Sequence, residues 1–562
     1  MTGTSRGRPA RGRRLPRLAT VVFIAAVSGT ALVFQRPPRA LPTDSPPEVF
    51  AAGRALRHVQ AIAQDPHPLG SAAEEPVRAY ILAELKALGL EPEIQQPRDA
   101  RPPGPEARSD PSRRDVRNIL ARRRGSGPPS KKAVLLSAHY DSVTRGPGAG
   151  DDASGVAAIL ETLRALQAGP PLERDLIVLI NEGEEAGLLG ADVFAEDHPW
   201  AKDVGVVLNL DARGNAGPSY MFETSDGNGW LIEQLALALP HPMATSLTMA
   251  VYRLLPNDTD LTIYKRHGMA GLNFAFVEGL SYYHSPEDIP ANLDPRTLQH
   301  QGENLLAMTR HLGRLDLDDV RRGDVVYTSL LQQLVVIYPQ TWVLPLMGGA
   351  VLAYVGVMML GIARGRIRRS EVVAGFGIFL LAMLAAVLAV GGLWSVLSDR
   401  LYRMGVIVFR PDLGHGSGML VSRFDIALLT GFAVLAVGIV VVIFVGSGRR
   451  WSLEGLGLGV LGWWLAVTVA ASVWLPGASY AFVWPLLAIL AGQAVAFTVT
   501  QGGIIALLAS WLGAVPLLVI HLMILPGIFH GLNLRMAGPL MIPVVLVAAA
   551  LVPLASQVLN RR

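Results

Sequence analysis

Acidic and histidine side chains follow a series of short apolar runs, each at the point where a strand is expected to end. His139 and Asp141 follow the run 133–138, and Asp211 follows the run 204–210. Residues of the same kind recur as Asp151 with Asp152, Glu184 with Glu185, and His284 in the segment 282–286. Carboxylate and imidazole ligands without sulfur suit a hydrolytic zinc centre that keeps an open position for water. The pattern predicts an enzyme.

Each of these residues also has an ordinary structural explanation. The pair Asp151 and Asp152 opens a helix-like stretch, where an acidic N-cap is common. Glu184 and Glu185 would be favoured in a first helical turn by the helix dipole. Their joint occurrence at successive strand ends is much harder to obtain by accident, and it favours the functional interpretation.

Apolar runs of strand length alternate with helical patterns in the part of the chain that carries these residues. The runs are 133–138, 175–180, 204–210 and 271–277; the helical patterns are 153–167, 186–196 and 227–239, after a leading pair near 51–64 and 76–88. This alternation predicts an α/β fold with a mainly parallel mixed sheet flanked by helices. Sites in such sheets lie beyond the carboxyl ends of strands. Segment 98–131, rich in Pro, Arg, Ser and Gly, is expected to be largely surface loop.

The remainder of the chain has the composition of a membrane protein. An apolar run at about 18–34 follows six arginines, and seven further candidate spans lie near 342–363, 372–397, 424–446, 453–475, 479–500, 503–525 and 537–557. Each approaches the ~20 residues that a helix needs to cross a bilayer. We expect an uncleaved anchor in 1–35, with a cleaved signal peptide as the alternative because 26–31 holds small residues.

Arginines mark one side of the predicted membrane plan. They cluster at 364–369, at 449–450 and at the C-terminus, which the positive-inside rule assigns to the cytoplasm. Residues 36–340 then form an extracytoplasmic domain, and 341–562 form a seven-span domain whose least certain boundary is near 500–503. The polar residues Glu371, Asp425 and His521 fall at or near span ends, so no ion path is predicted.

Charge and cysteine content exclude several classes of function. The net charge of +4 comes largely from arginines beside apolar runs, so it indicates topology rather than nucleic-acid binding. The chain has no cysteine, which excludes disulfides, thiolate ligands and a cysteine nucleophile. The expected partners are a peptide substrate and the lipid bilayer.

Five ordered motifs resemble family M28 of zinc peptidases. They are SAHYDS at 137–142, GAGDDASG at 148–155, NEGEEAGLLG at 181–190, NLD at 209–211 and YHS at 283–285. The match covers about 50–315. An anchor, an exported peptidase and a multi-span tail together also resemble the branch of endoplasmic-reticulum metallopeptidases and vacuolar membrane proteases.

The resemblance implies two Zn2+ ions per chain. Asp151 would bridge them, with His139 and Asp211 on one ion and Glu185 and His284 on the other. A bridging anion is chemically sensible because two neighbouring dications repel each other.

The resemblance also implies roles for residues around the ligands. Glu184 would be the general base, and Asp141 would orient His139. The peptide bond from Asp151 to Asp152 is often cis in the family. Tyr283 would stabilise an oxyanion, with a packing role or Tyr282 as the alternatives, and segment 257–260 is a candidate for the rim of the site.

The leading prediction is a membrane-anchored two-zinc aminopeptidase. Carboxypeptidase and dipeptidase specificities remain open because both occur among relatives. Two other functions remain as alternatives: a single-zinc glutaminyl cyclase, and a membrane scaffold whose peptidase-like domain binds peptides without cleaving them.

Overall fold

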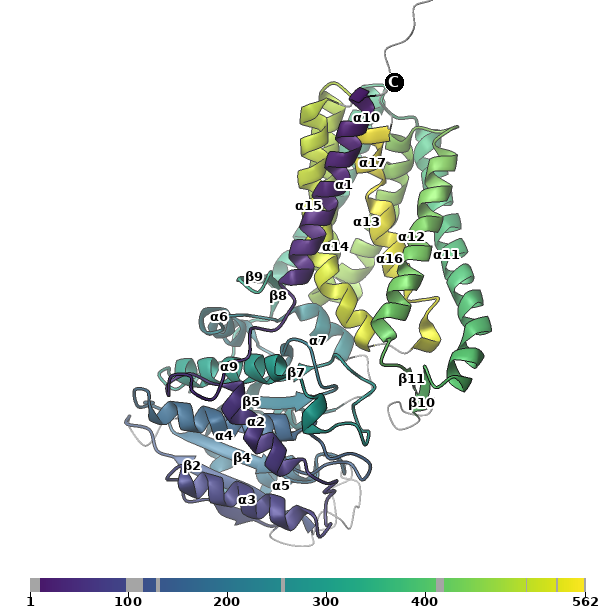
Figure 1. Ribbon diagram of the computed structural model, residues 1–562. Helices are drawn as coiled ribbons and strands as arrows, with labels where there is room; N and C mark the ends of the chain where they lie inside the picture. The colour runs from purple at the N-terminus through teal and green to yellow at the C-terminus, as the bar shows by residue number, and fades with distance from the viewer. Residues whose placement is uncertain are drawn as a thin grey trace, which may run out of the picture. The chain divides into compact units, whose positions relative to one another are not determined.

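The computed structural model describes residues 11–97, 115–127, 132–253, 258–410, 419–501, 503–531 and 534–559 (Figure 1). The chain separates into two compact units. The sheet unit comprises Arg36–Gln340 together with Arg410–Arg423. The helical unit comprises Met1–Gln35, Thr341–Phe409 and Phe424–Arg562.

Within the described ranges, the sheet unit is built on seven strands in the order β1-β2-β4-β3-β5-β7-β6. The central strands β4, β3, β5 and β7 run parallel, while β1, β2 and β6 pair antiparallel toward the two edges. The bounds are β1 Glu93–Gln95, β2 Asn118–Arg123, β3 Ala133–His139, β4 Leu176–Asn181, β5 Val204–Ala212, β6 Tyr220–Thr224 and β7 Ala270–Phe276. The predicted fold class is confirmed.

Central strand β3 shows why helices cover both faces of the sheet. Its residues are all buried, and successive side chains of a strand point to opposite faces. Val134 and Leu136 pack in one core with α4, whereas Leu135 packs in another with α5 and α8. The helices of this unit are α2 Ala52–Ile62, α3 Glu74–Ala87, α4 Ala153–Gln167, α5 Leu189–Asp197, α6 Gly229–Ala238, α7 Ser246–Tyr252, α8 Asp260–Arg266 and α9 Pro295–Leu312.

Strand β2 lies within segment 98–131, much of which was expected to be surface loop. Residues 98–114 and 128–131 lie outside the described ranges, but Asn118–Arg123 pairs with β4 and buries Ile119, Leu120 and Ala121. Its short apolar core is surrounded by arginines, which hid the strand. The paired strands β8 Val325–Leu330 and β9 Leu334–Pro339 were likewise not predicted.

The helical unit contains, in the described part of the chain, eight helical segments long and apolar enough to cross a membrane. They are built from α1 Arg11–Val33, α10 Val343–Ala363, α11 Arg369–Arg403, α12 Asp425–Ser447, α13 Leu453–Trp474, α14 Tyr480–Thr498, α15 Ile504–Gly531, and α16 Met541–Ala550 with α17 Val552–Leu559. Helix α1 packs on α15, where the Phe23 and Trp511 rings stack with centroids 4.8 Å apart. His521 lies buried inside α15 rather than near a span end.

One segment changes unit along the chain. Arg410 and residues 419–423 lie between α11 and α12 in sequence but group with the sheet unit, while 411–418 lie outside the described residues. The flanking strands β10 Val408–Arg410 and β11 Met419–Val421 pair with each other. The predicted division at 340/341 left this segment with the membrane part.

Candidate metal centre

The five predicted ligands lie together in two groups that share Asp151. His139, Asp151 and Asp211 form one group, and Asp151, Glu185 and His284 form the other. Within each group the potential ligand atoms all lie within 4.8 Å of one another. This is the grouping implied by the resemblance to family M28.

Parallel strands bring these residues together at the carboxyl ends of the central strands. His139 ends β3 and is in register with Asn181, the last residue of β4. Asp211 lies near the end of β5, in register with Ala275 of β7. Loops leaving the carboxyl ends of neighbouring parallel strands emerge side by side, so ligands far apart in sequence converge.

Asp141 fixes two of these strand ends at once. The His139 Nδ1 atom lies 3.0 Å from the Asp141 carbonyl oxygen and 3.5 Å from its Oδ1. The Asp141 carboxylate also accepts hydrogen bonds from the backbone N–H groups of Glu184, at 3.2 Å, and Glu185, at 3.3 Å. The His139 Nε2 atom is left facing Asp151 Oδ1 at 3.2 Å. Asp141 therefore supports the histidine and the glutamate pair together.

Asp151 and Asp152 have different surroundings, and the peptide bond between them is cis. Asp152 is the N-cap of α4, where its side chain accepts from the Gly155 N–H at 3.1 Å. The structural explanation considered for this pair thus applies to Asp152. Asp288, buried nearby, accepts from the N–H groups of Gly150 at 2.7 Å and Asp151 at 3.3 Å.

His284 completes the second group from the segment after β7. Its Nε2 atom lies 2.9 Å from Glu185 Oε1 and 3.1 Å from Asp151 Oδ2. Yet neither His284 Nε2 nor Glu185 Oε1 has a hydrogen-bond partner with acceptable geometry in the described part of the chain. Donor atoms that converge in this way without bonding to one another fit a shared metal ion.

The cluster of buried carboxylates also indicates a metal site. Burial, together with the charges of Asp211 and other nearby carboxylates, raises the pKa of Glu184 well above its ordinary value. Burial and the charge of Asp151 raise the pKa of Glu185 to about 7. Such a cluster is unfavourable without positive charge, and cations reverse this effect. Nitrogen and oxygen donors without sulfur suit Zn2+.

Glu184 and Tyr283 lie beside the two groups rather than in them. Glu184 is half-buried. The Tyr283 ring stacks on the His284 ring with centroids 3.8 Å apart, and burial and the charge of Asp151 raise its pKa well above the ordinary value. The Tyr282 ring instead faces the Arg423 guanidinium at 5.3 Å. Tyr283 is therefore the tyrosine next to the carboxylates.

Asp260 and Asp288 are buried residues near the centre to which the sequence pattern gave no specific role. Asp260 accepts from Asn181 Nδ2 at 2.6 Å, and burial raises its pKa to about 6. It begins α8, and it is buried while Asp258 in the same segment is exposed; Asn257 lies outside the described residues. The sequence signal for Asp260 was its place in the rim candidate 257–260, and that for Asp288 was its nearness to the motif at 283–285.

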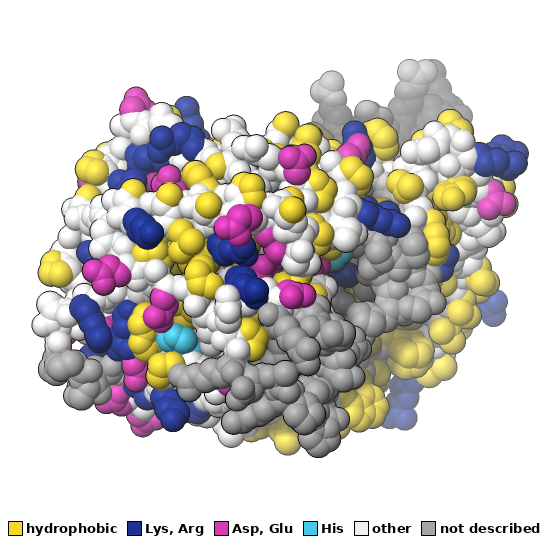
Figure 2. Space-filling view, turned by 90° about the horizontal axis from the view of Figure 1, so that it is seen from below, with side chains coloured by type: hydrophobic (Ala, Val, Ile, Leu, Met, Phe, Trp, Pro, Cys, Tyr) yellow, Lys and Arg dark blue, Asp and Glu magenta, His cyan; other side chains and the backbone are white. Residues whose placement is uncertain are grey.

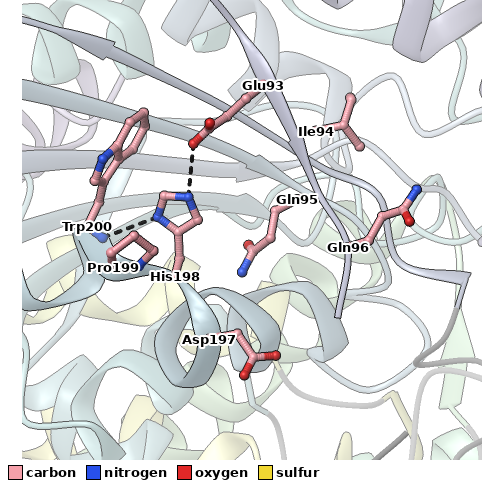
Figure 3. Close-up of a pocket in the computed structure, with 8 residues that line it drawn as sticks. All are labelled: Glu93, Ile94, Gln95, Gln96, Asp197, His198, Pro199 and Trp200. Carbon is pink, nitrogen blue, oxygen red and sulfur yellow. Dashed lines mark hydrogen bonds and ion pairs between the residues drawn. The ribbon is translucent and has the colours of Figure 1, made fainter. Parts of the chain in front are cut away.

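Two other polar places lie apart from this centre. Asp192, Glu196 and His267 form another group of possible ligands, half-buried to exposed. A cavity of about 370 Å³ is lined by residues 93–96 and 197–200, where His198 Nε2 lies 3.0 Å from Glu93 Oε1 (Figure 3). Neither place contains a residue from the five motifs. On the face shown in Figure 2, basic and acidic side chains are interspersed.

Comparison with known proteins agrees with the motif pattern. Residues 118–309 match the model of peptidase family M28. Endoplasmic reticulum metallopeptidase 1 of Rattus norvegicus is 34% identical over 245 residues, which cover 42% of this chain and 27% of that protein. Putative endoplasmic reticulum metallopeptidase 1 of Schizosaccharomyces pombe is 29% identical over 423 residues, covering 70% of this chain and 49% of that protein. The chain thus spans half or less of the length of these relatives.

Among solved structures, an aminopeptidase from Aneurinibacillus sp. strain AM-1 aligns with a TM-score of 0.39 and 15% sequence identity. That alignment covers 49% of this chain and 97% of the other.

Proposed function

We propose that this chain, in which residues 118–309 match peptidase family M28 and are accompanied by a set of candidate membrane helices, is a two-zinc exopeptidase that removes N-terminal residues from peptides outside the cytoplasm. The observation that carries the proposal is the pair of ligand groups sharing Asp151. A site for a single metal needs no carboxylate between two sets of ligands.

The proposed ligands divide between two zinc positions. His139 and Asp211 would hold one, Glu185 and His284 the other, and Asp151 would contact both. Bound zinc supplies polarisation of a peptide carbonyl and a lowered pKa for water. Asp141 and Asp288, through the bonds described above, would hold His139 and the Asp151 loop in place.

Glu184 is the proposed general base. Its carboxylate would take a proton from the attacking water and deliver it to the leaving amine. Glu184 suits this role because it neighbours the proposed ligand Glu185 in sequence but belongs to neither ligand group. Tyr283, beside His284, would donate a hydrogen bond to the oxyanion that forms on the former carbonyl.

The extracytoplasmic position rests on the arginine distribution. Arginines follow α10 at 364–369 and α12 at 449–450, two helices apart in the chain. The positive-inside rule then supports a non-cytoplasmic location for the sheet unit.

Peptide hydrolysis by the full-length protein in detergent tests the activity. The full chain is required because residues 410–423 belong to the sheet unit. We expect release of N-terminal residues from unblocked peptides and none from N-acetylated copies. Glu184→Gln should lower kcat at least ~100-fold with zinc content unchanged.

Other outcomes would contradict specific parts of the proposal. Equal cleavage of blocked peptides would exclude an aminopeptidase. Cyclisation of N-terminal glutamine with a single bound zinc would favour a glutaminyl cyclase. Peptide binding without any product would favour a scaffold.

A further inference from the structure

The segment that carries His284 has an unfavourable backbone conformation. His284 has φ 52°, a left-handed value that residues with a Cβ rarely adopt. Local contacts shape the turn, since Ser285 Oγ donates to the Tyr282 carbonyl at 2.6 Å. The orientation of the His284 ring depends on whatever holds this backbone in place.

Arg410 binds the two carbonyl groups at the centre of this turn. Its Nη2 atom donates to the Tyr283 carbonyl at 2.9 Å and also to the His284 carbonyl. The Arg410 side chain is buried, being only 9% exposed as a residue. A planar guanidinium with several N–H donors can hold two neighbouring acceptors at once, as a lysine ammonium does less well.

Further contacts from the same segment, residues 410–423, reach the same turn. Val421 is fully buried against Leu280, with Tyr283 packed beside them. Arg423 forms an ion pair with Glu287 and lies over the Tyr282 ring. Hydrogen bonds, apolar packing and an ion pair therefore connect Arg410, Val421 and Arg423 to residues 280–287.

We propose that Arg410 is a positioning residue for His284, and that Arg410, Val421 and Arg423 are required parts of the metal centre although they lie between two candidate membrane helices in sequence. The inference rests on the proposed function, because it takes His284 to be a zinc ligand. It gives the multi-span tail a direct role: the tail supplies the segment that holds one of the two zinc-binding groups in shape.

The geometry makes the effect selective. Arg410 contacts the backbone of His284, which belongs to the Asp151–Glu185–His284 group. His139 lies on β3 and Asp211 lies on β5. Neither strand contains residues from 410–423. Loss of Arg410 should therefore weaken one zinc position and spare the other, whereas a purely structural role would affect both positions or neither.

Zinc release from the full-length protein in detergent tests this. Wild type, Arg410→Ala, Arg410→Lys and Arg403→Ala would be equilibrated with rising concentrations of a zinc chelator, and bound zinc counted by mass spectrometry. Arg403 is the matched control, an exposed arginine near the end of α11 whose side chain bonds the Asp399 carbonyl in its own helix.

We expect Arg410→Ala to release one of its two zinc ions at a chelator concentration about 10-fold or more below that for wild type. The second ion should be retained, and kcat should fall more than KM rises. Arg410→Lys should restore part of the retention, and Arg403→Ala should match wild type. Arg423→Ala, which changes an exposed side chain and spares the fold, should shift release in the same direction by less.

Two results would overturn the proposal. One is identical zinc release by wild type and both Arg410 variants. The other is simultaneous loss of both ions from Arg410→Ala with a lowered thermal midpoint, since that indicates a structural role. A wild type that binds two zinc ions but cleaves no peptide would refute the proposed activity, while its zinc release would still decide the role of Arg410.

Discussion

Asp141 is not a proposed ligand, but it contacts three residues of the centre. Its carboxylate accepts N–H groups from Glu184 and Glu185, and it also lies against His139. A single buried acid thus supports a ligand of each zinc position and the proposed base. The three groups keep their relative positions only while this carboxylate has two accepting oxygens.

Asp141→Asn should therefore weaken both zinc positions. The amide keeps one accepting oxygen and turns the other acceptor into a donor facing a backbone N–H. We expect zinc affinity to fall about 10- to 100-fold, measured by release to a chelator. Asp44→Asn, at an exposed site, is the control. Unchanged release by Asp141→Asn would show that His139 and the glutamate pair are held by other contacts.

His300 makes a pH-dependent contribution to stability away from the centre. It is fully buried, with Nδ1 accepting from the Ser219 N–H and Nε2 bonded to the His241 carbonyl. Burial lowers its pKa to about 4 from 6.5. The unfolded chain therefore takes up a proton first as the pH falls. The stabilisation is complete above pH 6.5 and is lost toward pH 4, by about 3 kcal/mol.

His300→Gln should remove this part of the pH dependence, because glutamine can keep both hydrogen bonds without titrating. Thermal midpoints in detergent between pH 7.5 and pH 4.5 would show a smaller fall for the variant than for wild type. Parallel curves would mean that His300 does not titrate differently in the folded and unfolded states.

The sequence predicted residues at strand ends better than residues that approach from elsewhere. His139, Asp211 and the glutamate pair follow apolar runs, so a strand pattern was enough to suggest that they converge. Asp260 and Asp288 follow no such run. They enter through α8 and a loop, and only the fold brings Asp260 to Asn181 and Asp288 to Asp151. Arg410 is separated from His284 by more than a hundred residues, so no local pattern connects the two.

Among the elements of the helical unit, the first turn of α13 is held by a buried ion pair. Glu454, 2% exposed, lies 2.8 Å from Arg366, which follows α10, and also accepts from Gln557 of α17 at 3.1 Å. The pair thus ties together three segments that are distant in sequence. Removing one partner leaves a buried charge without compensation.

Glu454→Ala should destabilise the helical unit by about 3–5 kcal/mol and lower the thermal midpoint in detergent. Glu454→Gln should have a smaller effect, since its amide oxygen still accepts from Gln557. Zinc content should not change in either variant that remains folded. An unchanged midpoint for Glu454→Ala would mean that water replaces the carboxylate beside Arg366.

The elements of the sheet unit were predicted where the hydrophobic pattern was long and uninterrupted. Helix 153–167 matches α4 to the residue, and β3 and β5 begin where expected. Strand β2 was missed because only three of its residues are apolar and arginines surround them. Its assignment depends on pairing with β4, a contact that no local pattern reveals.

At the scale of the whole molecule, the absence of cysteine makes the topology directly measurable. Asp44→Cys, in the sheet unit, and Arg449→Cys, after α12, would each introduce a single thiol at an exposed position. A membrane-impermeant maleimide should label Asp44→Cys in intact cells and Arg449→Cys only after permeabilisation. The reverse pattern would place the sheet unit in the cytoplasm and refute the proposed location.

Zinc stoichiometry of the full-length protein in detergent tests whether Asp151 bridges a two-zinc centre. Wild type should bind about two zinc ions per chain. His139→Ala and His284→Ala should each retain about one, because each removes a ligand of one position only. Asp151→Asn should lose most of both. One zinc in wild type, lost with His139→Ala but kept with His284→Ala, would contradict the bridged pair.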